Sequence, residues 1–220
     1  KKALEEANGD FDGAVKIIRE RGQEVAKKRS DREATEGVVL AKSSDDRKKA
    51  AMVVLNCETD FVAKNDDFVK FASKILDKAI EEGPANLEAL KSVKIDDTTI
   101  GEKVTEQVGI IGEKIELSHY AFAEAEDLTA YIHPGNKLAA IVGFDKQIDP
   151  EVGKDVAMQV AAMAPVAIDK DGVKQEIIDQ EMKNIKEKAR QEGKPEEMLE
   201  KIATGRLNKF FKESTLLNQE

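Results

Sequence analysis

The stretch VVLAKSSDDRKKAAMVVL, residues 38–55, decides how we expect this chain to fold. Its two apolar runs, residues 38–40 and 51–55, flank the polar segment 43–46, which reads Ser-Ser-Asp-Asp. Short valine-rich runs on either side of a Ser/Asp turn are typical of a β-hairpin. We therefore predict two paired strands at this point.

An amphipathic helix is expected after the hairpin and a short loop. Asp66 is a plausible N-cap for this helix, and Gly83-Pro84 supplies a stop signal. Six apolar residues between them recur at helical spacing: Phe68, Phe71, Ala72, Ile75, Leu76 and Ala79. A stripe of this kind predicts a helix that packs one face against the sheet.

The same order of elements recurs further along the chain. Residues 128–132 form a short apolar run, residues 133–136 are a strong turn signal, and residues 138–142 form a return strand. A helix opens at Asp149-Pro150, and four apolar residues are expected on its sheet-facing side: Val152, Val156, Val160 and Met163. The sequence thus predicts an α+β fold with two related strand-turn-strand-helix core halves.

The N-terminal stretch predicts two helices outside this core. Residues 2–7 favour a short helix, and Asp10 is the expected N-cap of a second one that ends near Gly22. The highly polar segment 23–36 is typical of either a linker or a solvated helix, and a linker is the favoured interpretation.

The C-terminal stretch predicts a protruding helical hairpin over residues 173–211. Its first helix carries apolar residues at steps of 4, 3 and 4, which is a heptad seam: Ile178, Met182, Ile185 and Ala189. Gly193-Lys194-Pro195 breaks the helix before the pattern resumes at 198–207. With a helix over 100–111 and a strand over 115–122 added, we divide the chain into four parts: 1–30, 31–125, 126–170 and 171–220.

Composition excludes several classes of protein. The chain has 44 acidic and 35 basic residues among 220, a net charge of −9, and only 5% aromatic residues. This balance argues against a nucleic-acid binder, and no apolar run approaches the ~18 residues of a membrane span. A single cysteine, Cys57, excludes an internal disulfide. Without an apolar signal core at its start, the chain is expected in the cytoplasm.

Catalytic patterns are weak. His119 and His133 have no second ligand at helical spacing for a metal, and no local nucleophile signature accompanies them. Cys57 is expected to be a partly buried thiol, and residues 109–112 are a helix end rather than a phosphate loop. An enzyme that uses one histidine with nearby acids remains an alternative, as does a plain scaffold of repeats.

The loop of residues 56–65 is the most unusual stretch. It joins a strand end to a helix start, and it places Phe61 directly after Asp60. On periodicity alone, the favoured interpretation is that Phe61 staples the following helix onto the core. The alternative is an exposed aromatic anchor beside a carboxylate, which is typical of a protein-binding hot spot.

This loop resembles the signature of the bacterial translation elongation factor Ts family, with Thr59-Asp60-Phe61-Val62 as its most specific part. Further matches follow one another in order along the chain: 1–10, similar to the family's ubiquitin-associated-like module, then 111–115, 157–162, 193–195 and 205–207. The family pattern extends beyond both ends of the match, so the chain is expected to be a fragment.

The resemblance implies a guanine-nucleotide exchange factor that binds elongation factor Tu. It implies that Phe61 enters an apolar pocket of the GTPase, that Asp60 disturbs its Mg²⁺ site, and that Thr59 and Val62 complete the contact. A second contact is implied on the later core helix at Gln159, where some members carry histidine. No catalytic residue, cofactor, protein-bound metal, nucleic acid or membrane is implied, and self-association stays open.

Overall fold

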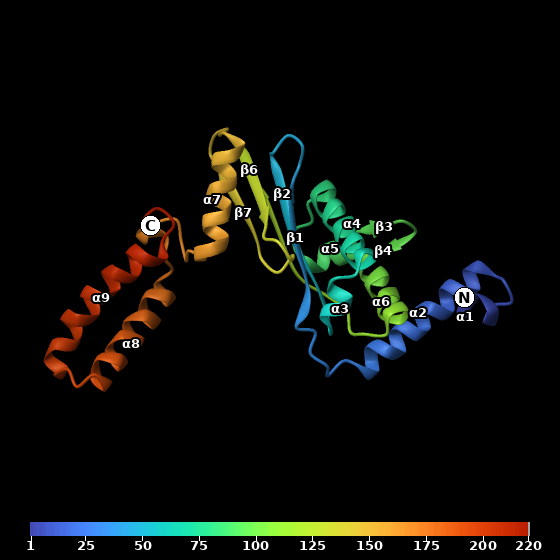
Figure 1. Cartoon of the computed structure of the whole chain (residues 1–220), viewed down its shortest axis with the longest axis horizontal. Coiled ribbons are helices and arrows are strands. Elements are labelled where there is room, and N and C mark those ends of the chain that lie inside the picture. Colours follow the sequence, from blue (N-terminus) through green and yellow to red (C-terminus); the bar gives the residue numbers. More distant parts are fainter. Residues whose placement is uncertain (220) are drawn as a thin grey trace. The chain divides into compact units, whose positions relative to one another are not determined.

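The computed structural model describes residues 1–219 of the chain, which divides into two compact units, Lys1–Met158 and Gln159–Glu220. The first unit contains most of the elements (Figure 1): α1 (Lys2–Glu6), α2 (Phe11–Lys28), β1 (Glu36–Ser43), β2 (Lys49–Cys57), α3 (Asp60–Ala63), α4 (Asp66–Glu82), α5 (Leu87–Ser92), β3 (Lys94–Ile95), β4 (Thr98–Thr99), α6 (Ile100–Ile111), β5 (Glu116–Glu124), β6 (Asp127–Ile132) and β7 (Ala139–Phe144). Helix α7 (Pro150–Met163) runs from the first unit into the second, which also holds η1 (Lys170–Gly172), α8 (Gln175–Gln191), η2 (Glu196–Met198) and α9 (Leu199–Ser214). None of the helices in residues 1–219 is long and apolar enough to cross a membrane.

The predicted hairpin forms the centre of the first unit. Strands β1 and β2 pair antiparallel, with Val38 opposite Leu55 and Ser43 opposite Ala50. Strand β5 pairs with the other edge of β2, which gives the sheet order β1-β2-β5. The alternation along β2 sends Val53 and Leu55 into the core, where both are fully buried.

Helix α4 covers this sheet as predicted (Figure 1). Five of its six stripe residues are buried and Phe71 is half-buried. Its cap differs by one residue from the prediction, because Asn65, not Asp66, accepts hydrogen bonds from the backbone N–H groups of Asp67 and Phe68. Gly83 ends the helix in the left-handed conformation.

The second hairpin, β6–β7, lies beside β1. The N–H of Val39 donates to the carbonyl of Asn136 at 2.8 Å, and the hydroxyl of Ser43 donates to the carbonyl of Leu128 at 3.0 Å. Helix α7 follows β7, so the order strand-turn-strand-helix occurs twice and the α+β class is confirmed.

The predicted sheet-facing side of α7 is wrong at two of its four residues, whereas Val156 and Val160 are half-buried. Val152 and Met163 are exposed, and the buried residues are Gly153 and Ala157. The reason is a close approach: a Cβ atom on Gly153 would lie 2.4 Å from Thr129 Oγ1 on β6. Since only a glycine allows this contact, the helix turns its smallest residues toward the sheet.

Helix α2 also differs from the prediction. Asp10 caps it as expected, but it continues through Gly22 to Lys28, into the segment interpreted as a linker. Gly22 lies against α6, where a Cβ atom would be 2.3 Å from the carbonyl oxygen of Thr105. The glycine that we expected to end the helix is therefore a helix–helix contact.

The end of α2 is part of the core, contrary to the expectation that the N-terminal piece lies outside it. Val25 and Ala26 pack against the main apolar cluster. Glu106 on α6 is buried and forms an ion pair with Arg19 at 2.6 Å, so that charge as well as close packing joins the two helices. The predicted helix at 100–111 is confirmed, and Gly112 ends it in the left-handed conformation.

The second unit contains the predicted helical hairpin. Helices α8 and α9 contact each other through four buried residues: Ile185, Ala189, Leu199 and Ala203. Ile178 and Met182 are half-buried at the open end of the seam. Met198 departs from the pattern, because it lies in η2 and is exposed. The four-part division at 30, 125 and 170 stays a prediction.

Candidate functional site

The segment between β2 and α4 makes a single helical turn. Ala63 is buried and Val62 packs against the core, and these contacts fix the core-facing side of the turn. Phe61 points the other way and is 83% exposed, whereas Phe68 on α4 is 2% exposed. The core-staple interpretation, which periodicity alone favoured, is therefore wrong. The alternative, which the family resemblance supports, predicts that Phe61 is far more exposed than Phe68 or Phe71, and this exposure is confirmed. We call residues 59–62 the Phe61 turn.

Asp60 lies beside Phe61 and carries a charge. Its carboxylate is 2.7 Å from the ammonium group of Lys64, one helical turn later, and its side chain is about half exposed. The hydrogen bond from Lys64 lowers the pKa of Asp60 below its usual range. The Phe61 turn thus presents an aromatic ring and an ionised carboxylate side by side at neutral pH.

Glu58 precedes the turn and is held from two directions. It accepts the backbone N–H of Lys114 at 2.6 Å and the guanidinium of Arg29, whose Nη1 lies 2.7 Å from both carboxylate oxygens. The hydrogen bond from Lys114, followed by the charge of Arg29, lowers the pKa of Glu58. This carboxylate fixes the start of the turn to the α6–β5 loop and to the end of α2.

Glu113 holds the same segment from the α6–β5 loop. Its Oε2 accepts the N–H groups of Glu58 at 3.2 Å and Thr59 at 3.1 Å, and its Oε1 accepts the hydroxyl of Thr59 at 2.7 Å. Sequence reasoning gave no role to Glu58 or Glu113. Both lie inside stretches that resemble the family, which was the only available signal, because their hydrogen-bond partners are 29 to 56 residues away.

Cys57 supports the turn and is not reactive. It is fully buried, and its thiol donates to the carbonyl of Thr59 at 3.2 Å. Burial raises the pKa of the Cys57 thiol to about 11, so the group remains protonated at neutral pH and lacks the thiolate that a nucleophile needs.

Gln159 is half-buried on α7 and belongs to the second unit. The structure brings Thr59, Asp60, Phe61 and Val62 together in one turn. A role for Gln159 in the same site stays a prediction.

The two histidines form no catalytic constellation. His119 is exposed on β5, and its Nδ1 lies 2.9 Å from the hydroxyl of Ser118. That hydroxyl donates its own proton to Asn56 Oδ1, so it is not set up to give the proton to His119. The Nδ1 atom of His133 lies 2.9 Å from the hydroxyl of Tyr131. Within residues 1–219, this is the only side-chain hydrogen bond of His133. Within residues 1–219, no group of three His, Cys, Asp or Glu side chains is placed to hold a metal ion.

The Phe61 turn combines an exposed aromatic ring and an ionised carboxylate on a backbone that packs against the core. These are features that the hot spots of protein-docking sites share.

Comparison with known proteins places this chain in a family. The family model described as "Elongation factor TS" matches residues 58–220. The chain is 50% identical to "Elongation factor Ts" of Porphyromonas gingivalis (strain ATCC 33277) and 51% identical to that of Amoebophilus asiaticus, over all of this chain and 80% of each relative. It is 45% identical to the protein of the same name from Chloroherpeton thalassium, over all of this chain and 79% of the relative. The chain belongs to the elongation factor Ts family.

Proposed function

We propose that this chain is a guanine-nucleotide exchange factor that binds elongation factor Tu in the cytoplasm and accelerates the release of GDP during translation elongation. The observation that carries the proposal is the 83% exposure of Phe61 next to an ionised Asp60 on a fixed turn. Large aromatic residues beside charged groups are frequent among the hot spots of protein–protein interfaces.

The action on the GTPase follows from how GDP is held. A phosphate loop and Mg²⁺ together neutralise the charge of the diphosphate in GTPases. Phe61 would enter an apolar pocket of the partner, and Asp60 would place a negative charge near the ligands of the metal. Thr59 and Val62 orient this pair, and Gln159 on α7 would add a second contact.

The thermodynamics require only differential binding. If the factor binds the nucleotide-free partner more tightly than the GDP-bound partner, then GDP binding is weakened by the same ratio. No covalent bond is made or broken in this step. The chain consequently needs no catalytic acid, no base and no cofactor of its own.

The proposal is tested by mixing the chain with elongation factor Tu loaded with the fluorescent analogue mantGDP, in excess unlabelled GDP. Fluorescence decay should accelerate with the concentration of the chain and then saturate. A chain that binds elongation factor Tu in a pull-down but leaves the decay unchanged is a scaffold, and the proposal then fails. Unchanged decay with no binding also contradicts it.

A further inference from the structure

Two neighbouring loops in the first unit are joined by reciprocal hydrogen bonds, in which a glutamate of each loop accepts backbone N–H groups of the other. Glu58, just before the Phe61 turn, accepts the backbone N–H of Lys114 in the α6–β5 loop. Glu113 in that loop accepts the backbone N–H groups of Glu58 and Thr59. Each loop thus supplies the acceptor for the other loop's main chain.

The α6–β5 loop is itself anchored. The ammonium group of Lys114 donates to the carbonyl oxygens of Ser30 at 3.1 Å and Arg32 at 3.0 Å, directly after α2. Arg29 of the same segment holds Glu58. Glu113 therefore acts from a loop that is tied to a second part of the fold.

The Phe61 turn depends on this support more than an ordinary helix would. Helix α3 has only four residues, and a single turn is unstable without outside contacts. Thr59 occupies its N-cap position, yet its side chain makes no capping hydrogen bond. Its hydroxyl donates to Glu113 at 2.7 Å instead. The start of the turn is thus fixed by Glu113 rather than by its own cap.

We infer that Glu113 is a positioning residue for nucleotide exchange, and that it holds Thr59 so that Phe61 and Asp60 face the partner in a preorganised geometry. The inference rests on the proposed function of the Phe61 turn. Rigid presentation raises the effect of a binding residue because less conformational freedom is lost in the complex. Glu113 itself need not touch elongation factor Tu.

A double-mutant cycle on mantGDP release tests this role. Glu113→Ala should slow exchange by about tenfold, in the range of couplings measured between contacting residues. In a Phe61→Ala background, the same substitution should have a much smaller effect, because the ring that Glu113 positions is gone. Equal factors in both backgrounds would show that Glu113 acts independently of Phe61 and would overturn the inference.

Two further variants separate positioning from a general loss of structure. Glu113→Gln keeps one oxygen that can accept both N–H groups, and its NH2 group can donate to the Thr59 hydroxyl, because a hydroxyl can accept a hydrogen bond after rotating. Its exchange rate should therefore stay close to that of the parent. Thr59→Val removes the hydroxyl donor and should slow nucleotide exchange in the same direction as Glu113→Ala, whereas Thr59→Ser keeps that donor and should slow it less than Thr59→Val does. If Glu113→Ala does not fold, the threonine pair still decides: no difference between valine and serine contradicts the inference.

Hydrogen exchange gives a readout that does not depend on activity. The backbone N–H hydrogens of Glu58 and Thr59 should exchange with solvent faster in Glu113→Ala than in the parent. The hydrogen-exchange rates along α4 should stay unchanged. Glu124→Ala is the matched control, because Glu124 is an exposed carboxylate on β5 whose only ion pair, within residues 1–219, is with Lys49. It should alter neither readout.

The outcomes also separate this inference from the function on which it rests. If Phe61→Ala slows GDP release and Glu113→Ala does not, the inference fails and the function stands. If Phe61→Ala accelerates GDP release from elongation factor Tu as much as the parent does, the proposed role of the turn fails, and the inference fails with it.

Discussion

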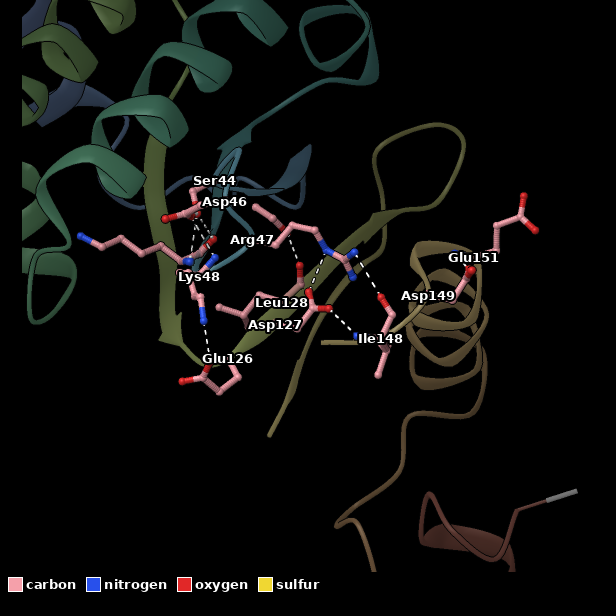
Figure 2. A network of polar contacts seen from close by, with 12 residues as sticks. Ser44, Asp46, Arg47, Lys48, Glu126, Asp127, Leu128, Ile148, Asp149 and Glu151 are labelled. Atoms are coloured by element: carbon pink, nitrogen blue, oxygen red, sulfur yellow. Dashed lines mark hydrogen bonds and ion pairs between the residues drawn. The ribbon is translucent and has the colours of Figure 1, made fainter. Parts of the chain in front are cut away.

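The Nε atom of Arg47 lies 2.7 Å from a carboxylate oxygen of Asp127, and this ion pair joins the two hairpins of the first unit (Figure 2). Asp127 is 2% exposed. Its other oxygen accepts the N–H of Ile148, just before α7, at 2.9 Å. The carbonyl of Arg47 accepts the N–H of Leu128 at 2.7 Å. One buried carboxylate thus connects the β1–β2 turn, the start of β6 and the approach to α7.

Asp127→Ala should therefore lower the free energy of unfolding by about 3 kcal/mol, since removing one partner leaves a partly buried guanidinium unpaired. The matched control is the neighbouring pair of Lys48 and Glu126, which is exposed on both sides. Glu126→Ala should cost about 0.5 kcal/mol or less. Urea denaturation followed by circular dichroism measures both, and equal losses would contradict the assigned importance of the buried pair.

Gly22→Ala should destabilise the fold although alanine favours helices. The new Cβ atom would lie 2.3 Å from the backbone of α6, so the two helices would have to separate, at a cost of about 2 kcal/mol. Gly205→Ala on α9 is the control, because nothing surrounds that position within 4 Å. It should raise stability by about 0.5–1 kcal/mol. Thermal melts of both variants check the opposite signs.

Phe61→Ala and Phe68→Ala should respond in different assays. Phe68 is a buried residue of α4, so its truncation should cost about 3–5 kcal/mol of stability. Phe61 is exposed, so its truncation should leave the melting temperature nearly unchanged and slow GDP release by the loss of about 2 kcal/mol or more of partner interaction. A large drop in melting temperature for Phe61→Ala would instead indicate a structural role.

Asp60→Asn tests the electrostatic part of the proposed mechanism, because it keeps the shape of the side chain and removes its charge. If the carboxylate acts on the Mg²⁺ site, the variant should lose exchange activity chiefly when Mg²⁺ is present. With the metal chelated, GDP is already held less tightly and the variant should approach the parent. Equal defects with and without Mg²⁺ would leave only the role of Phe61.

Lys64→Ala complements this experiment. Lys64 is the cation that lowers the pKa of Asp60, so its removal frees the carboxylate while leaving it charged at neutral pH. The variant should fold normally, because both side chains are substantially exposed. Its exchange rate should stay far closer to the parent rate than that of Asp60→Asn. A defect as large as that of Asp60→Asn would show that the ion pair, not the carboxylate, is what the partner needs.

Local patterns were enough to predict most elements. The apolar runs of β1 and β2 around a Ser/Asp turn, the stripe of α4 and the 4, 3, 4 steps of α8 are each typical of one structure type. The fold class follows from the order of these elements, because each must bury its apolar face against a neighbour. The conspicuous loop of residues 56–65 was also visible, since an aromatic residue stands there among polar ones.

The tertiary structure decided what these patterns leave open. The sequence pattern of an aromatic residue near a helix start is the same whether the ring packs inward or outward. The packing of Val62 and the burial of Ala63 are what turn Phe61 toward solvent. From sequence alone, Gly22 indicates a helix end. In the fold, α6 lies so close to α2 at this position that a side chain larger than that of glycine would clash. The role of Glu113 has no signal in the sequence apart from the family resemblance of residues 111–115, because its partners are distant in sequence. A periodic pattern reports one face of one element, whereas close approaches and long-range hydrogen bonds depend on which backbone lies opposite.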